Sequence, residues 1–265
     1  MSPEVKGEAP QIEAYKREEA RRSDAIAQRV YTRYRRRFAT KHLFQRQHRL
    51  ILSALCEDKR HREGRFRLLD VGCGFGSLLQ EAYQQGMEAH GVELAPWNAR
   101  TARADLPDPI CVYLGDAERL PFQAATYDGV VFKGVLHHLG NPKKALKEAY
   151  RVLKPEGMIC IFEGDPTSLY RRFVLGIADL LKIQHETTLF RHLAPQEIVS
   201  LLEEVGFTDI RIKPISGLFV PVGLQGWGGS RLWHFFDVVE TGLQRRLPSY
   251  FRWHNSFLGR KPRES

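Results

Sequence analysis

The segment Leu68–Leu79, LLDVGCGFGSLL, places three glycines at alternate positions between two apolar runs. An apolar run of this length bounded by glycine is typical of a buried strand, and the following run opens a helical pattern. Gly72, Gly74 and Gly76 at such a strand-to-helix turn allow the backbone to approach a ligand closely. The segment therefore predicts a ligand site just beyond the end of a buried strand.

The sequence around this segment alternates strand-like and helical runs. From Phe66 onward the strand-like runs are FRLLDV, EAHGVEL, ICVYL, YDGVVF and GMICIF. Such an alternation is typical of an α/β fold with a parallel, doubly wound sheet. Further along, APQEIVSLLEEVGF predicts a helix that starts at Pro195 and stops at Gly206. Between Asp165 and Ala194 we expect a less regular insertion, and TDIRIKP and FRWHNSFLG predict two last strands.

Composition favours one ordinary globular core. The chain has 265 residues with 43% hydrophobic content, enough to bury a large α/β core. The N-terminus is polar where a secretory signal needs an apolar segment, and no apolar run approaches the roughly 18 residues of a membrane span. The four cysteines show no paired zinc-site spacing. We expect a cytoplasmic protein without a metal site, at most peripheral to a membrane.

Positive charge is concentrated near the N-terminus. The net charge is +9, and residues 1–65 contain 17 basic and 9 acidic residues. A helical pattern is expected over residues 12–55, so the surplus fits a solvated helix face, an anionic membrane, an acidic substrate or a nucleic acid. We assign residues 1–62 to a basic helical extension or cap. Residues 63–265 form the main domain, with lid-like insertions near 165–194 and 216–247.

Acidic residues follow three of the predicted strands. In doubly wound sheets, ligands bind beyond the carboxyl ends of the strands, where Asp70, Glu93 and Asp116 occur. Glu93 is placed to accept hydrogen bonds from a ribose diol. A dinucleotide is disfavoured because Ser77 replaces the third glycine of its fingerprint, and because Asp70 would repel a pyrophosphate while attracting an ammonium group. The pattern favours a nucleoside that carries a cationic amino acid.

Five ordered motifs resemble the class I S-adenosylmethionine-dependent methyltransferases, particularly the subgroup that includes ubiquinone and menaquinone methyltransferases. These motifs are LLDVGCGFGSLL, GVEL, GDAERLPF, YDGVVFKGVLHHL and ALKEAYRVLKPEGMICIFE, which together cover about Phe66–Glu163. The resemblance implies a Rossmann-like, seven-stranded, doubly wound sheet with its last strand antiparallel. It also implies enzymatic methyl transfer with S-adenosyl-L-methionine as cofactor.

The resemblance also implies roles for individual residues. The glycine turn would pass beneath the methionine moiety, Asp70 would meet its ammonium, Glu93 the ribose hydroxyls and Asp116 the edge of the adenine. Lys133 departs from the family, in which small or neutral residues are more usual, and it could meet the methionine carboxylate or the acceptor. The implied cofactor-binding set is Asp70, Gly72, Cys73, Gly74, Gly76, Glu93, Leu94, Asp116, Ala117 and Lys133.

A sulfonium methyl is already activated, so the protein must hold the acceptor near it and remove a proton if the acceptor is a hydroxyl. Histidine suits this task at neutral pH. We rank His137 first and His138 second, followed by His185 and His192 in the insertion, with Glu163 as a further candidate base. Each histidine has a structural alternative, since it can simply brace a loop.

The acceptor is less well defined by the sequence. No D/N-P-P-Y/F motif follows the fourth strand, which argues against amino methylation of a DNA base. The segments 166–191 and 217–246 are rich in leucine and aromatic residues, and beside a basic N-terminus they suit a hydrophobic substrate and a peripheral membrane contact. We expect methylation, most readily at oxygen, of a small hydrophobic or aromatic metabolite. An RNA methyltransferase and a noncatalytic S-adenosylmethionine-binding scaffold remain alternatives.

Overall fold

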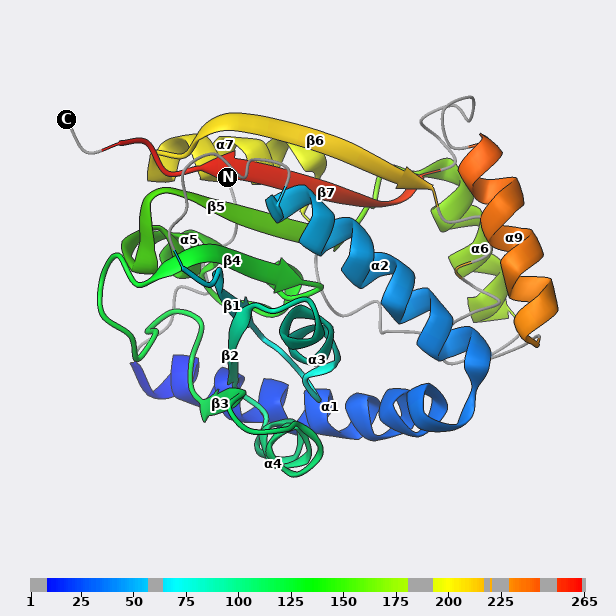
Figure 1. Cartoon of the computed structure of the whole chain (residues 1–265), viewed down its shortest axis with the longest axis horizontal. Coiled ribbons are helices and arrows are strands. Elements are labelled where there is room, and N and C mark those ends of the chain that lie inside the picture. The colour runs from blue at the N-terminus through cyan, green and yellow to red at the C-terminus, as the bar shows by residue number, and fades with distance from the viewer. Residues whose placement is uncertain are drawn as a thin grey trace.

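The computed structural model describes residues 9–56, 64–180, 193–216, 220, 229–243 and 252–263. It is built on one seven-stranded sheet in the order β3-β2-β1-β4-β5-β7-β6 (Figure 1). The strands are β1 (Arg67–Val71), β2 (Glu88–Glu93), β3 (Cys111–Leu114), β4 (Tyr127–Lys133), β5 (Leu153–Gly164), β6 (Thr208–Ser216) and β7 (Arg252–Arg260). His185 and His192 lie outside the described residues, so their predicted role stays a prediction.

Helices flank the sheet and extend beyond its edges. They are α1 (Ala9–Arg36), α2 (Phe38–Cys56), α3 (Ser77–Gln84), α4 (Pro96–Asp105), η1 (Leu136–His138), α5 (Pro142–Val152), α6 (Leu169–Leu180), α7 (Pro195–Val205) and α9 (Ser230–Leu243). We expected an irregular insertion after Asp165. The structure corrects this expectation, because the segment contains helix α6. Its apolar residues divide between a packed side and an exposed side, and this division hid the helical period.

Local sequence signals explain where several helices begin and end. Pro96, Pro142 and Pro195 each occupy a first helical position, where the missing N–H costs nothing. Asn141 caps α5 by accepting a hydrogen bond from a backbone N–H. Gly206 ends α7 with φ of 106°, a left-handed conformation that favours glycine. These features confirm the helix predicted from Pro195 to Gly206.

The chain reverses direction across the sheet between β1 and β4. Strands β1, β2 and β3 run outward in parallel, and the chain then returns to place β4 on the other side of β1. Strand β7 enters antiparallel between β5 and β6. The predicted doubly wound, seven-stranded sheet with an antiparallel last strand is therefore confirmed.

The two faces of the sheet bury different sets of side chains. Val71 and Phe132 pack into a cluster with residues of α5 and α7. Leu68, Val131 and Cys160 pack into a second cluster with residues of α2, α3 and α4. Because successive side chains of a strand point to opposite faces, each buried strand contributes to both layers. The near-continuous apolar runs of the sequence follow from this double burial.

The N-terminal segment forms two helices with different surroundings. The helical conformation is interrupted at Arg37, between α1 and α2. In α2, Ile51, Leu52 and Leu55 are fully buried in the cluster that contains Leu68. Helix α2 is thus part of the layer that covers the sheet, whereas α1 packs on α2 and α4.

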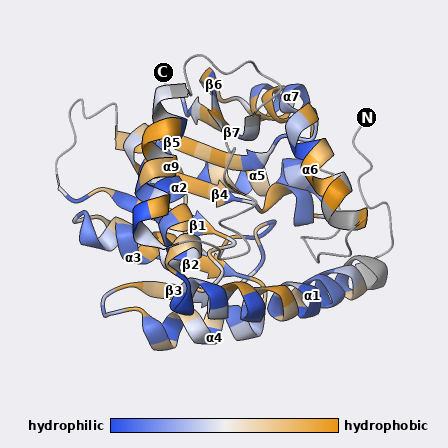
Figure 2. Ribbon diagram, turned by 90° about the vertical axis from the view of Figure 1, so that its right-hand side faces the viewer, coloured by the Kyte–Doolittle hydropathy of each residue, from blue (hydrophilic) through white to orange (hydrophobic). Residues whose placement is uncertain are grey.

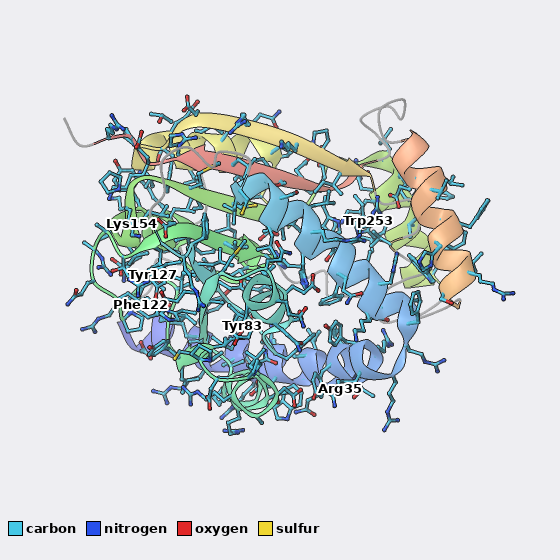
Figure 3. All side chains as sticks on the ribbon, in the orientation of Figure 1. Arg35, Tyr83, Phe122, Tyr127, Lys154 and Trp253 are labelled. Atoms are coloured by element: carbon cyan, nitrogen blue, oxygen red, sulfur yellow. The ribbon has the colours of Figure 1, made fainter. Side chains whose placement is uncertain are left out.

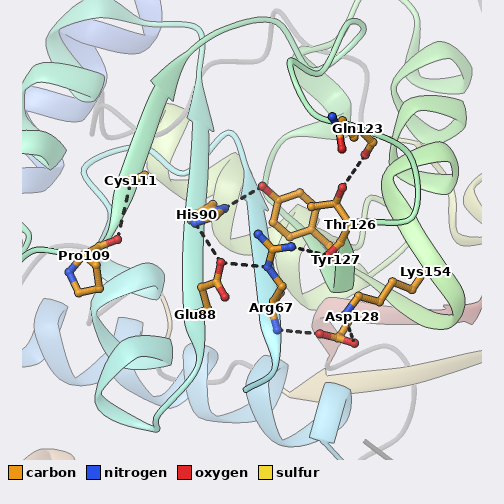
Figure 4. A network of polar contacts seen from close by, with 10 residues as sticks. All are labelled: Arg67, Glu88, His90, Pro109, Cys111, Gln123, Thr126, Tyr127, Asp128 and Lys154. Atoms are coloured by element: carbon orange, nitrogen blue, oxygen red, sulfur yellow. Dashed lines mark hydrogen bonds and ion pairs between the residues drawn. The ribbon is translucent and has the colours of Figure 1, made fainter. Parts of the chain in front are cut away.

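A polar network braces the amino ends of the central strands (Figure 4). The amide of Arg67 donates to Asp128 at 2.8 Å, and Lys154 donates to the same carboxylate at 3.1 Å. Nearby, His90 Nδ1 lies 2.9 Å from the Tyr127 hydroxyl. These polar groups have partners within the protein, so this edge of the sheet is stabilised internally.

We expect Leu52→Ala to lower the free energy of unfolding by about 2–5 kcal/mol, because it opens a cavity beneath the sheet. Ser53→Ala, at the neighbouring exposed position of the same helix, should change it by about 0.5 kcal/mol or less. Urea denaturation followed by circular dichroism measures both. Equal values for the two variants would show that α2 is not part of the core.

Candidate active site

The glycine turn after β1 is shaped by close packing on two sides. Gly72, Gly74 and Gly76 have φ of 72°, 56° and 80°, in the left-handed region. A Cβ on Gly72 would lie 2.5 Å from the Val135 side chain, and one on Gly76 would lie 2.5 Å from Leu106. A Cβ on Gly74 would meet no atom within 4 Å. The middle glycine therefore presents backbone to open space, where a ligand can approach.

Glu93 fastens the glycine turn to the end of β2. Its Oε2 accepts the amide of Gly74 and its Oε1 accepts the amide of Ala95, both at 2.8 Å. Burial raises the pKa of Glu93, while these amide donors act in the opposite direction. Each carboxylate oxygen can accept more than one hydrogen bond, so ribose hydroxyls can still donate to it.

Asp70 is a buried acid with a partnerless oxygen. Its side chain is at the end of β1, and Oδ1 accepts no hydrogen bond from the described part of the chain. Burial, together with the nearby Glu93, raises the pKa of Asp70 to about 7, against the lowering effect of Lys133. A buried acceptor without a donor is costly, and a ligand ammonium would supply one. This position suits a cationic ligand.

Lys133 extends from the end of β4 toward α2. Its Nζ lies 4.1 Å from the centre of the Phe44 ring, a cation–π contact. The same charge lowers the pKa of Asp70 and of Glu81, both of which burial raises to about 7. Glu81 Oε1 in turn lies 2.8 Å from Nδ1 of the fully buried His48. Lys133 therefore adds positive charge on the Asp70 side of the turn.

Cys73 contributes packing and backbone rather than a reactive thiol. Its side chain is buried, and a Cβ built on Gly91 would lie 2.6 Å from its sulfur. Burial raises the pKa of the Cys73 thiol well above its usual value. Its amide donates to the carbonyl of Val92 at 3.1 Å, which anchors the turn to β2. Leu94 lies directly after β2, and Ala117 is buried in the core beside the turn after β3.

Asp116 meets α1, which the sequence did not predict. Lys16 Nζ lies 2.5 Å from Asp116 Oδ2 and 3.1 Å from Glu118 Oε2. The other oxygen of Glu118 accepts the amide of Asn141 at 2.9 Å. The cation of α1 thus joins the turn after β3 to the start of α5.

Two further turns are bound by α1. The Tyr15 hydroxyl donates to the carbonyl of His138 at 3.1 Å, and Glu19 Oε1 lies 2.8 Å from His138 Nδ1. Asp24 accepts the amide of Trp97 at 3.1 Å, at the start of α4. Helix α1 therefore lies across the turns that follow β2, β3 and β4. His138 contacts α1 through both its ring and its carbonyl, and its predicted role as a base stays a prediction.

His137 forms a buried pair with Glu163. Nδ1 of His137 lies 2.8 Å from Oε2 of Glu163, and their side chains are only 7% and 4% exposed. The second oxygen, Oε1, accepts the amides of Val135 at 2.9 Å and Leu136 at 2.7 Å. The carboxylate at the end of β5 therefore fixes both the loop after β4 and the orientation of the imidazole ring.

Comparison with known proteins agrees with this geometry. Residues 69–161 match the family described as "Methyltransferase domain". The demethylmenaquinone methyltransferase of Symbiobacterium thermophilum is 30% identical over 214 residues, which cover 66% of this chain and 85% of that protein. The chain is a class I S-adenosylmethionine-dependent methyltransferase. The methyltransferase is also 29% identical to the demethylmenaquinone methyltransferase of Staphylococcus aureus over 192 residues, or 64% of this chain and 79% of that one.

Solved structures show the same fold at low identity. Phosphoethanolamine N-methyltransferase 2 of Haemonchus contortus aligns with a TM-score of 0.60 and 18% identity, over 85% of this methyltransferase. The alignment covers only 56% of that longer chain. A SAM-dependent methyltransferase from Archaeoglobus fulgidus aligns with a TM-score of 0.55 and 22% identity, over 83% of this chain and 99% of that one.

The cofactor of this methyltransferase is S-adenosyl-L-methionine, and the chain offers groups that fit it. The open backbone at Gly74 and the partnerless oxygen of Asp70 suit a methionine moiety with its ammonium. For Glu93, the predicted contact is with the ribose hydroxyls. The roles of individual residues remain predictions that binding measurements can test.

We expect Glu93→Gln to weaken S-adenosylmethionine binding about ten- to a hundredfold, because a charged acceptor is lost at the diol and at the glycine turn. The matched control is Glu88→Gln at the other end of β2, whose side chain is 40% exposed. Isothermal titration calorimetry measures both affinities. Equal binding by wild type and Glu93→Gln would remove Glu93 from the cofactor site.

The raised pKa of Asp70 predicts that cofactor affinity depends on pH. Below pH 7 the carboxyl group of the cofactor-free protein is largely protonated and cannot pair with an ammonium. Affinity should therefore increase from pH 5.5 to 7, by up to about tenfold per pH unit, and then level off. Asp70→Asn should bind more weakly at pH 7.5 and show a flat profile. A profile in that variant as steep as in wild type would assign the titration to another group.

Proposed function

We propose that this methyltransferase transfers a methyl group to a hydroxyl oxygen of a small, hydrophobic aromatic acceptor. The observation that carries the proposal is the buried His137–Glu163 pair. It lies beyond the carboxyl ends of β4 and β5, and β4 is the strand that pairs with β1 and its glycine turn. The support is that His137 lies at the same end of the parallel strands as Asp70 and Glu93.

The pair can set the tautomer of the imidazole. With Glu163 accepting the Nδ1 hydrogen, the lone pair of His137 is on Nε2, where it can accept a proton. A phenol with a pKa near 10 is ionised in only about one molecule in a thousand at pH 7, so a base greatly increases the reactive fraction. S-adenosylmethionine supplies an electrophilic methyl group on a sulfonium. With cofactor and acceptor bound, Nε2 of His137 would take the acceptor O–H proton, and the methyl group would pass from the sulfonium sulfur to the acceptor oxygen.

The relatives support the acceptor class. Both are named as demethylmenaquinone methyltransferases. The reduced form of a quinone is an aromatic diol, so a phenolic hydroxyl on a hydrophobic ring is the group that His137 would deprotonate. A phenolate also carries charge on its ring carbons, and product analysis by mass spectrometry and NMR distinguishes transfer to oxygen from transfer to carbon.

We expect His137→Gln to lower kcat on a phenolic acceptor about 10²–10⁴-fold, while S-adenosylmethionine affinity stays within about twofold. Glu163→Gln should lower kcat by a smaller factor and displace the acidic limb of the pH–rate profile, because a neutral amide orients the ring less strongly. Steady-state kinetics between pH 5.5 and 9 with calorimetry of cofactor binding measures these effects.

His90→Gln provides the matched control. His90 also has a hydrogen-bonded Nδ1, but it contacts Tyr127 within the brace at the amino ends of the strands. This variant should keep the wild-type kcat and pH profile. Normal turnover and an unchanged profile in His137→Gln would contradict the proposed base, and no turnover of any phenolic acceptor by wild type would contradict the acceptor class.

A further inference from the structure

Exposed apolar side chains are concentrated at one end of the molecule. Of the eleven large apolar side chains that are exposed in the described part of the chain, eight belong to α6, α9 and the first residue of α2. On α6 they are separated by four, four and three residues, which places them on one face of the helix. Their exposed fractions are 61% for Leu169, 67% for Phe173, 41% for Ile177 and 80% for Leu180.

Helix α9 and the start of α2 carry a second set of exposed apolar side chains at the same end of the molecule. Leu232, Phe235 and Val238 recur every three residues along α9 and are 44%, 61% and 73% exposed. Phe38, at the start of α2, is 43% exposed, and its ring centre lies 6.3 Å from that of His234 in α9. Both helices lie at one extremity of the molecule (Figure 1), and Figure 2 looks onto this end. We call these eight side chains the apolar end face.

The opposite sides of the two helices are already packed. Tyr170 of α6 meets Trp253, labelled in Figure 3, with ring centres 5.7 Å apart. On α9, Glu240 is 1% exposed and forms an ion pair of 2.6 Å with Arg46 of α2. Contacts inside the protein therefore hold the helices, and the apolar end face is not the side through which they pack.

Among the side chains that the structure describes there, the exposed charged residues around the apolar end face are basic. Among side chains that the structure describes on α6 and α9, the exposed charged ones are Arg172 and Arg231. Beside Phe38, the exposed charged residues are Arg36, Arg37 and Lys41. Apolar side chains bordered by cations match a surface of anionic headgroups over hydrocarbon. The charge pattern thus favours a lipid surface over an apolar protein groove.

We propose that the apolar end face docks this methyltransferase onto an anionic lipid bilayer. The contact is peripheral, with leucine and phenylalanine side chains at acyl depth and the arginines at the headgroups. In the described residues no helix is long and apolar enough to cross a bilayer. The assignment adds α6 and α9 to the basic N-terminal segment that the sequence suggested, which contributes Phe38 and its cationic neighbours Arg36 and Arg37.

The apolar end face is connected to the site by a short, ordered segment. Only four residues separate Gly164, the end of β5, from Leu169. Within that segment Asp165 accepts the amide of Thr167 at 2.9 Å and the Asn255 side chain at 2.9 Å. If the proposed hydrophobic acceptor is correct, the bilayer that binds α6 is also its source. The docking itself does not depend on that acceptor.

Flotation of the full chain with vesicles tests the proposal. We expect binding to vesicles of phosphatidylglycerol and phosphatidylcholine, and at least about tenfold weaker binding to phosphatidylcholine alone. The double variant Phe173→Glu, Leu180→Glu should bind anionic vesicles at least about tenfold more weakly than wild type, since each lost side chain reduces partitioning strongly. Leu114→Glu, at an exposed position of the edge strand β3, is the matched control and should bind like wild type.

Thermal melts should be unchanged in all variants, because the substituted side chains are exposed, and the double variant should methylate a water-soluble phenol at the wild-type rate. Absence of wild-type flotation with anionic vesicles, or equal flotation of wild type and double variant, would overturn the proposal. Light scattering that shows a wild-type dimer and a monomeric double variant, with neither floating, would instead assign the face to a second copy. Failure to methylate phenols would leave the flotation result intact.

Discussion

The parallel pairing of β1 with β2 on one side and β4 on the other is the constraint on which the site depends. Asp70 lies in register with Gly91 and with Val131, so the last residues of the three strands reach the same edge of the sheet. The turns that follow are thereby brought together. Glu93 then accepts amides from two of them, so one buried carboxylate joins the glycine turn to the turn after β2.

The two edges of the sheet differ in their electrostatics. At the amino ends of the strands, the Arg67 amide and the Lys154 side chain both donate hydrogen bonds to the Asp128 carboxylate. At the carboxyl ends of the strands, Asp70 is buried, one of its oxygens has no hydrogen-bond donor in the described part of the chain, and its pKa is raised. Burying an acid in this way destabilises the protein without ligand. A buried carboxylate that destabilises the protein when it has no partner, and that can pair with a cation, is typical of a binding site.

Helix α1 gives the N-terminal segment a role that its charge alone did not reveal. Lys16, Glu19 and Asp24 meet the turns after β3, β4 and β2, so these three side chains are directed into the protein. Charged residues three to five positions apart also occur on any solvated helix face, and sequence cannot distinguish the two cases. The exposed apolar side chains that we propose to meet a lipid surface lie on α6, on α9 and at Phe38.

The sequence by itself determined the sheet, the glycine turn and the acids after its strands, because these depend on periodicity and local backbone requirements. It placed Asp70, Glu93 and His137 at strand ends, where parallel strands bring chemistry together. It could not pair His137 with Glu163, which is 26 residues away in the chain, nor show that Lys16 meets Asp116. It also could not decide which apolar residues of α6 are packed and which are exposed. Those contacts depend on how separate elements dock, and only the tertiary structure fixes that.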